Sequence, residues 1–432
     1  MRLGEVVVDV APLRSGRNFR LVFATQAISM VGTHLTSVAA SVQVYDLTGS
    51  SLQVGLMSLV LGLSLLVGLV AGGLLADRAD RRRIVLVTRA LTALVIAALA
   101  VNAALPEPRV WFVFVAAVLA GLTGGLGGPA LMAATPGLVA PGQLAAAGAL
   151  ITLTAQLGAM AGPALAGLVA AGPGVAMCFA IDAGIYVVGL ALLAPLPALP
   201  PEGAGEAPHP LRAMAQGVRF VRGNQVVAGL LLIDVCAVVF AMPYALFPEM
   251  AAEHFDGGAS TVGLLYAAPA VGSFCSALTS GWAGRVHHTG RALIGAVGLW
   301  GAGIACFGLS PGLWLALLFL ALAGFGDTAS EILRRALLQH HTPDRLQGRV
   351  GSLWLAQATA GPSVGNLEAG LVARALGSSA GAAAVGGLVC LAGVAALAVA
   401  MPQLRRATLQ GPPATEDREP APPAEAADRP TP

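Results

Sequence analysis

The sequence predicts an all-α membrane protein whose twelve transmembrane helices form two pseudo-symmetric six-helix bundles. Three observations predict this: an apolar composition, a series of long apolar runs, and an internal repeat of six runs. Of the 432 residues, 56% are hydrophobic and only 11% are charged, whereas about a quarter of the residues in soluble domains are charged. The lipid bilayer is therefore the expected solvent.

Twelve runs are long enough to cross a bilayer, which takes about 20 mostly apolar residues. Short charged or Pro/Gly-rich breaks separate them. The expected spans are 19–45, 51–76, 84–104, 110–134, 143–170, 174–196, 226–248, 259–283, 291–310, 312–333, 347–372 and 378–402. Pro/Gly-rich stretches at 123–137 and 241–248 are expected to bend their helices, because proline removes a backbone hydrogen bond.

The chain divides in its middle, with six spans on each side of a linker. The linker ends in "HPLRAMAQGVRFVRG", which places apolar side chains on one helical face and arginines elsewhere. This pattern is typical of a cationic helix lying on the inner leaflet. The expected parts are a bundle at 1–196, the linker at 197–225, a second bundle at 226–403 and a tail at 404–432 whose composition predicts disorder.

The two halves resemble one another. "GLLADRADRRR" at 73–83 and "GWAGRVHHTGR" at 281–291 both lie between the second and third spans of their half. "PGQL…AGLVAA" at 141–171 and "PDRL…AGLVAR" at 343–374 bracket the fifth span of each half. Such a repeat predicts a transporter with its binding site between the halves.

The arginines predict the orientation. With both termini in the cytoplasm, nearly all loop arginines fall on the cytoplasmic side, and only Arg109 and Arg374 fall outside. The outer loop at 248–258 holds Glu249 and Glu253 but no arginine. The expected location is the cell membrane, with multiple passes.

The composition also argues against several functions. A net charge of +2 gives no reason to expect a nucleic-acid partner. The five cysteines lie in apolar runs without a C-x-x-C pair, so neither a metal site nor a disulfide is expected. No phosphate loop or nucleophile constellation is recognisable, and no cofactor is expected. A membrane enzyme or a receptor therefore fits less well than a transporter.

Ionisable side chains inside the spans are functional candidates, because placing them in a bilayer is costly. The candidates for proton coupling or for lining a substrate cavity are Asp234, Asp327, Glu331, Arg334, Glu368, His34 and Asp182. Candidate cavity aromatics are Tyr45, Tyr186, Tyr244, Phe240, Trp354 and Phe274, for each of which packing or lipid contact is the alternative.

Three of the ionisable candidates share a helical face, since Asp327, Glu331 and Arg334 are four and three residues apart. Glu331 and Arg334 form either a structural ion pair or part of a coupling site. Asp234 has no basic residue in its own span. For that reason we expect it, ahead of Asp327, to carry the proton.

The remaining candidates each have a structural alternative. Asp182 is expected to be structural, and Glu368 to serve as an outer gate or a packing contact. His34 is either a hydrogen-bonding residue of the helix interior or a cavity residue that handles protons.

Two motifs resemble those of the major facilitator superfamily. Residues 73–83 look like its cytoplasmic loop motif G-x-L-x-D-R-x-x-R-R, with matches that include Gly73, Asp77, Arg78, Arg81 and Arg82. In relatives this loop latches the two halves together on the cytoplasmic side. The resemblance therefore gives Asp77 a gating role, while the arginines also suit an anchor on the inner leaflet.

The fifth span carries the second motif. Its residues Gly158, Gly162, Pro163 and Gly167 resemble the fifth-helix motif of drug:proton antiporters, although Leu168 replaces the last glycine of the usual pair.

Four further stretches resemble the enterobactin-exporter group of the superfamily. They are "VYDLTGSSLQVGL" (44–56), "IDVCAVVFAMPYALFPEM" (233–250), "GDTASEILRRALLQHHTP" (326–343) and "GRVGSLWLAQATAGPSVGNLEAGLVA" (348–373). The resemblance implies a proton-driven exporter that moves a siderophore or a similar amphipathic metabolite by alternating access, as a monomer. The alternative is a macrolide or multidrug efflux pump. Thr33 stands where relatives often carry an acid in the first helix.

Overall fold

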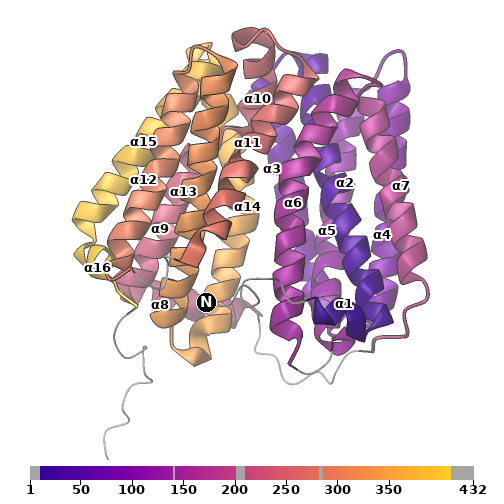
Figure 1. Ribbon diagram of the computed structural model, residues 1–432, viewed down its shortest axis with the longest axis horizontal. Coiled ribbons are helices and arrows are strands. Elements are labelled where there is room, and N and C mark those ends of the chain that lie inside the picture. The colour runs from indigo at the N-terminus through magenta and orange to yellow at the C-terminus, as the bar shows by residue number, and fades with distance from the viewer. Residues whose placement is uncertain (1–9, 140–141, 201–209, 282–285, 410–432) are drawn as a thin grey trace, which may run out of the picture.

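A computed structural model describes residues 10–139, 142–200, 210–281 and 286–409, and these residues form helices and no strand. Figure 1 shows two bundles side by side, the N-terminal one on the right and the C-terminal one on the left. The predicted all-α fold with two six-helix halves is confirmed.

The N-terminal half contains six long helices and a short leading turn. The leading turn is α1 (Ala11–Ser15), and the long helices are α2 (Arg17–Thr48), α3 (Ser51–Ala76), α4 (Arg81–Ala104), α5 (Val110–Ala134), α6 (Leu144–Ala171) and α7 (Val175–Leu193). All six are long and apolar enough to cross a membrane.

The C-terminal half begins with a broken span. Its elements are α9 (Gln225–Phe240), a 3₁₀ turn (Tyr244–Leu246), α10 (Phe247–Glu249), a π turn (Met250–His254), α11 (Ala259–Leu278), α12 (Thr289–Gly308), α13 (Leu313–His340), α14 (Asp344–Leu376) and α15 (Ser379–Ala400). Eleven segments of the described chain have the length and apolar character of a span. Helix α14 is the twelfth long helix, and its polar first turns, with Asp344, Arg345 and Arg349, lower its hydropathy.

The regular helix is interrupted or ends within both Pro/Gly-rich stretches. The helix stops at Phe240 and resumes at Tyr244, next to Pro243. In the second stretch, 123–137, α5 continues through Pro129 to Ala134 and a 3₁₀ turn at Thr135–Leu138 follows, so the regular helix ends inside the stretch but not at Pro129. The glycines there serve close packing, because a Cβ on Gly125 would collide with the backbone of α3.

Two short helices lie outside the bundles, at the end of the molecule that also holds the 77–83 turn. Within the expected linker, α8 covers Pro210–Gly223 and contacts α14, where Gly217 lies against Arg349 and Leu353. Helix α16 (Pro402–Arg406) buries Leu404 completely, so the chain leaves the bundle after the expected start of the tail at 404. Residues 410–432 of that tail lie outside the described residues. The end of the molecule that holds α8, α16 and the 77–83 turn is called the arginine-rich end here, and it is at the bottom of Figure 1.

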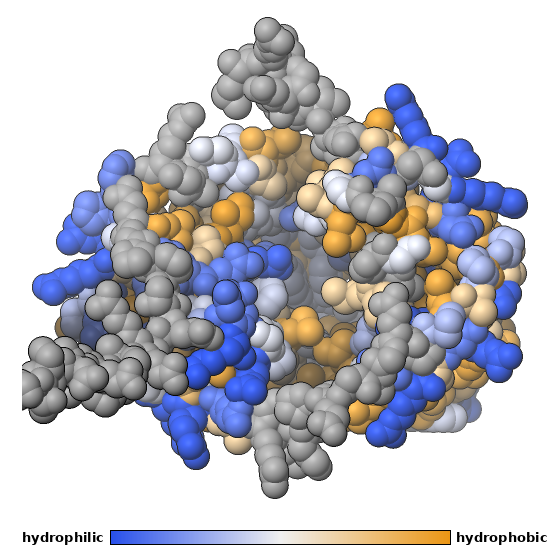
Figure 2. All heavy atoms as spheres, turned by 90° about the horizontal axis from the view of Figure 1, so that it is seen from below, coloured by the Kyte–Doolittle hydropathy of each residue, from blue (hydrophilic) through white to orange (hydrophobic). Residues whose placement is uncertain are grey.

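The two halves touch at the opposite end, which we call the closed end. There Ser51 donates a hydrogen bond to Glu249, and the Tyr45 hydroxyl donates to Glu253 Oε1 at 2.8 Å. Glycines allow the helices to meet, since Gly55 of α3 leaves no room for a Cβ against the backbone of Asn366 in α14. Figure 2, seen from the arginine-rich end, shows a hollow between the halves.

Candidate functional site

A cavity of about 260 Å³ lies between the two halves. Helices of both halves build its wall, which includes His34, Ser37, Gln156, Pro163, Tyr244, Tyr266, Ser273, Trp300 and Asp327. The wall therefore combines aromatic rings and hydroxyls with one carboxylate, and no arginine is among the described residues that line it.

Aromatic side chains of the C-terminal half form one side of this cavity. Tyr244 and Tyr266 are stacked, with ring centroids 5.5 Å apart and an interplanar angle of 15°. The Tyr266 hydroxyl lies 3.1 Å from Ser41 Oγ and 3.0 Å from the Tyr244 carbonyl oxygen. Because Ser41 belongs to α2, this tyrosine joins the two halves above the cavity. Trp300 is 4% exposed, and its indole N–H has no hydrogen-bond partner among the described residues.

Asp327 of α13 is the carboxylate of the cavity wall. It is partly exposed to the cavity and lies close enough to Tyr244 and Arg334 to interact electrostatically with both. The ion pairs of the described chain do not include it. A carboxylate facing a cavity without a contacting cation is able to bind a proton or a polar group of a cargo.

A buried ion pair lies next to this carboxylate. Arg334 Nη1 of α13 is 2.8 Å from Asp234 Oδ1 of α9, and the two side chains are 6% and 4% exposed. Gln357 of α14 donates a hydrogen bond of 2.7 Å to Asp234 Oδ2. Asp234 has no cation in its own span, but a cation from another helix reaches it. This contact removes the reason for expecting Asp234, ahead of Asp327, to carry the proton.

Glu331 has a different partner from the one considered in the sequence. The alternative of a Glu331–Arg334 ion pair is wrong, because Arg335 Nη2 contacts Glu331 Oε1 at 2.5 Å while Arg334 turns to Asp234. Arg335 also lies 4.7 Å above the ring centroid of Trp354. The Glu331–Arg335 pair is largely exposed, at 37% and 59% of the two side chains.

The other candidates lie apart from the Asp234–Arg334 pair. His34 lies in the cavity wall, and its Cβ packs against Gly162 of α6. Asp182 is buried between α7 and α2, where Thr36 Oγ1 donates to its Oδ2 at 2.5 Å. Glu368 is partly buried on α14 and does not line the central cavity.

The glycines of the fifth-span motif bring α6 against two neighbours. A Cβ on Gly158 would lie 2.7 Å from the Met30 Cβ of α2, and a Cβ on Gly167 would lie 2.9 Å from Gly263 of α11. Pro163 lines the cavity. The motif thus packs α6 within its own half and against the other half.

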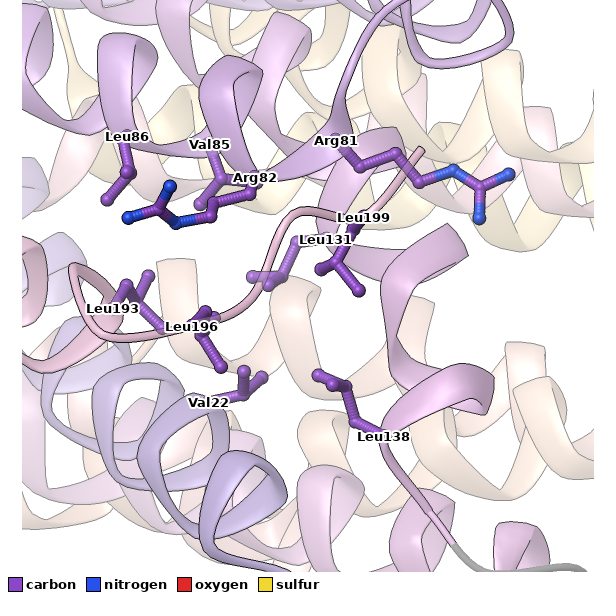
Figure 3. Close-up of a pocket in the computed structure, with 10 residues that line it drawn as sticks. All are labelled: Val22, Arg81, Arg82, Val85, Leu86, Leu131, Leu138, Leu193, Leu196 and Leu199. Carbon is purple, nitrogen blue, oxygen red and sulfur yellow. The ribbon is translucent and has the colours of Figure 1, made fainter. Parts of the chain in front are cut away.

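The loop motif at 73–83 fastens the arginine-rich end of the N-terminal half. Arg81 Nη1 donates to the Ala133 carbonyl of α5 at 3.1 Å, and Arg82 Nη2 donates to the Ala194 carbonyl after α7 at 2.5 Å. Figure 3 shows the two side chains pointing to different sides of a small leucine-lined pocket. These arginines therefore supply donors to carbonyl groups at the ends of two neighbouring helices.

The acidic residues of this loop differ in their surroundings. Asp80 caps α4 and accepts hydrogen bonds from the backbone N–H of Arg82 (2.9 Å) and Leu199 (3.1 Å). Asp77 and Arg78 are exposed, and neither has an ion pair or a side-chain hydrogen bond in the described part of the chain. Gly73 has open space around it, whereas a Cβ on the preceding Gly72 would collide with the backbone of α5 at Leu126.

Sequence reasoning missed two polar residues inside the helices. Arg89 lies within α4 and donates to Ser29 Oγ of α2 at 3.0 Å. Its presence in the expected span 84–104 was a signal of the same kind as the intramembrane acids. Gln357 is neutral, so no charge pattern pointed to its contact with Asp234.

Comparison with known proteins places this geometry in a family. The family model described as "transmembrane secretion effector" matches residues 7–423. The chain belongs to this family of the major facilitator superfamily. It is 35% identical, over 93% of its length and 95% of the relative, to the "enterobactin exporter EntS" of Shigella boydii serotype 18 and of Escherichia coli O81. It is a multi-pass membrane protein, and its relatives are transporters.

Solved structures share the fold at low sequence identity. A peptide transporter, POT, superposes with a TM-score of 0.70 at 15% identity, covering 91% of this chain and 96% of that one. A nucleoside transporter, NupG, gives a TM-score of 0.69 at 13% identity, covering 89% and 99%. These likenesses show the fold alone.

Proposed function

We propose that the protein is a secondary active exporter that uses the proton gradient to move a siderophore or a similar amphipathic secondary metabolite out of the cell by alternating access. The observation that carries this proposal is the cavity between the halves, with the free carboxylate of Asp327 in its wall and the buried Asp234–Arg334 pair next to it. The names of the curated relatives supply the cargo class.

The orientation follows from the distribution of charge. We place the arginine-rich end and both termini in the cytoplasm, because positively charged loops stay on that side. The closed end, with Glu249 and Glu253, then faces outward. In this orientation the hollow seen in Figure 2 opens toward the cytoplasm, where cargo for export is taken up.

Arg334 links the two acids in this mechanism. It contacts Asp234 directly and lies within electrostatic reach of Asp327. An ionised carboxylate in the membrane interior is costly unless it is paired. Proton binding to one acid therefore changes which acid Arg334 stabilises, and this exchange of partners ties protonation to the position of α13 against α9.

We assign Asp77 a role in the conformation in which the arginine-rich end is closed. In the conformation described here the arginine-rich end is open, and the exposed Asp77 side chain makes no ion pair or hydrogen bond that the structure records. We propose that it latches the halves when that end closes. One chain supplies both halves of the cavity, so we propose that a monomer functions, without a nucleic-acid partner.

Efflux of a cationic macrolide or another drug is the second candidate. The aromatic wall with one carboxylate and, among its described lining residues, no arginine favours it, because aromatic faces and a carboxylate both attract a cation.

The test uses inside-out membrane vesicles that contain the full-length protein. A metal-free catecholate siderophore and a macrolide are offered separately, with and without an uncoupler that dissipates the proton gradient. We expect the siderophore to accumulate only while the gradient persists. Accumulation of the macrolide alone would favour the drug pump, and gradient-independent accumulation would contradict proton-driven export.

A further inference from the structure

A group of polar side chains lies inside the N-terminal half, outside the cavity and away from Arg334. We call it the N-half cluster: Ser29 and Thr36 of α2, Arg89 of α4, and Asp182 and Tyr186 of α7. None of the five lines the central cavity. All lie in segments long and apolar enough to cross a membrane. Ionisable groups at such depth are costly and are retained for function.

The two oxygens of the Asp182 carboxyl have different surroundings. Its side chain belongs to a residue that is 1% exposed, and Oδ2 accepts one hydrogen bond, from Thr36. Oδ1 is buried and has no hydrogen-bond partner among the described residues. Gly32 faces this oxygen, and a Cβ there would collide with it. With one donor and no contacting cation, an ionised carboxylate would lack the partners that burial requires.

Arg89 is a cation in the same half, and its recorded contacts are with neutral groups. Its Nη1 donates to Ser29 Oγ, and its guanidinium carbon lies 5.8 Å from the centre of the Tyr186 ring. The ion pairs of the described chain do not include Arg89. Gly189 leaves space for it, since a Cβ there would lie 3.0 Å from Nη1. A partly buried cation and a buried acid thus lie in one half without contacting each other.

Tyr186 is near both of these groups. It is one helical turn from Asp182 on α7 and interacts with Asp182, Arg89 and Thr33. No ion pair of the described residues brings a charge from another helix to Asp182. Helix α6 contacts α7 through the Ala166 carbonyl and Cys178, and His34 of α2 faces α6 instead.

We propose that Asp182 is a second proton-binding carboxyl of the transporter, neutral in the conformation described here, and that Arg89 pairs with it once the proton has left. The O–H bond of the acid breaks, water takes the proton, and the Arg89 guanidinium exchanges Ser29 for the new carboxylate. This inference rests on the proposed proton-driven export. It adds a proton site in the half that the Arg334 pair does not reach.

The first test is infrared spectroscopy of the full-length protein in lipid nanodiscs. We expect the wild-type protein at neutral pH to show the C=O absorbance of a protonated carboxylic acid, and the Asp182→Asn variant to lose it. Thr36→Val keeps the carboxyl but removes its hydrogen-bond donor, so it should shift this absorbance in frequency. An absorbance that neither substitution changes would overturn the proposal. If Asp182→Asn does not fold, the Thr36→Val spectrum alone tests the proposal.

The second test counts protons. In proteoliposomes with a pH-sensitive dye, Asp182→Asn should exchange one proton fewer per siderophore molecule than the wild-type protein. Arg89→Lys, which keeps the cation, should retain the wild-type ratio, whereas Arg89→Gln should lower it. An unchanged ratio in Asp182→Asn would overturn the inference while leaving export intact. Absence of gradient-driven transport by the wild-type protein would instead contradict the proposed function.

Discussion

At the scale of single residues, Arg334 organises the charges of the C-terminal half. It is 5% exposed, yet its contact with Asp234 and the hydrogen bond from Gln357 to the same carboxylate compensate part of the cost of burial. Asp327 lies nearby without a contacting cation. The arrangement leaves two acids for one guanidinium, which is what an exchange of partners requires.

The first prediction concerns this buried pair. Arg334→Gln should lower the free energy of unfolding by about 3–5 kcal/mol, because it leaves Asp234 buried without its cation. Adding Asp234→Asn should restore much of the loss. Chemical denaturation in nanodiscs measures this, and Arg335→Gln is the matched control, since its exposed ion pair contributes about 0–1 kcal/mol. A double variant as unstable as Arg334→Gln would contradict the assignment.

The second prediction concerns Asp80. Partial burial raises the pKa of this carboxyl, but hydrogen bonds from the backbone N–H of Leu199 and Arg82, and the charge of Arg83, outweigh that effect and lower its pKa below the usual value. The stabilisation is therefore present above the ordinary pKa of an aspartate and is lost as pH falls through the lowered value. Asp80→Ala should cost about 1 kcal/mol at neutral pH and progressively less in acid.

Asp77→Asn is the comparison in the same loop. It should leave the stability of the described conformation unchanged, because the Asp77 side chain is exposed and makes no ion pair or hydrogen bond there that the structure records. It should nevertheless slow transport, since the proposed latch forms only when the arginine-rich end closes. Normal transport rates in a normally expressed Asp77→Asn protein would reduce the loop to a fastening and orientation signal.

At the scale of elements, glycines determine where helices of the two halves meet. At Gly55 of α3 and Gly370 of α14, a Cβ would collide with the backbone of the other half. Both positions lie toward the closed end. These glycines are therefore a requirement of closure, in addition to any effect on helix packing within a half.

The third prediction follows from this contact. Gly55→Val should keep α3 and α14 apart at the closed end. It should therefore shift the population toward the conformation in which the two halves are separated at that end. Spin labels at positions 105 and 309, both at the closed end and exposed, measure the separation in a background in which the five native cysteines are replaced. Gly184→Val is the control, because no atom lies within 4 Å of a Cβ there. Equal distance distributions in the two variants would contradict the role of Gly55.

The elements were more predictable than the contacts between them. Apolar runs revealed the spans because each must cross the same thickness of lipid, and "AMPYALFP" revealed the break after Phe240 because proline removes a backbone hydrogen bond. The partner of Arg334 was not predictable, since Asp234 is 100 positions away in the sequence and only the packing of α9 on α13 joins them. Asp80 and Asp77 look alike in sequence, and the start of α4 and the position of Leu199, which both give Asp80 a backbone donor, separate their roles.

At the scale of the whole molecule, charge is segregated between the two ends. The open end carries the arginines of the 77–83 turn and is surrounded by hydrophilic side chains (Figure 2), whereas Glu249 and Glu253 join the halves at the closed end. The fourth prediction is that a cysteine at position 254 reacts with a membrane-impermeant reagent from outside intact cells, and one at position 288 only after the membrane is made permeable. The opposite pattern would invert the proposed orientation.

The central claim is that export of the cargo is coupled to the entry of protons. It is tested most directly in sealed proteoliposomes without any imposed proton gradient, where a steep siderophore gradient is the sole source of energy and an internal dye reports pH. Efflux of siderophore should drive protons inward with the wild-type protein, and much less with Asp327→Asn. Siderophore movement at a normal rate without any change of internal pH would contradict the account.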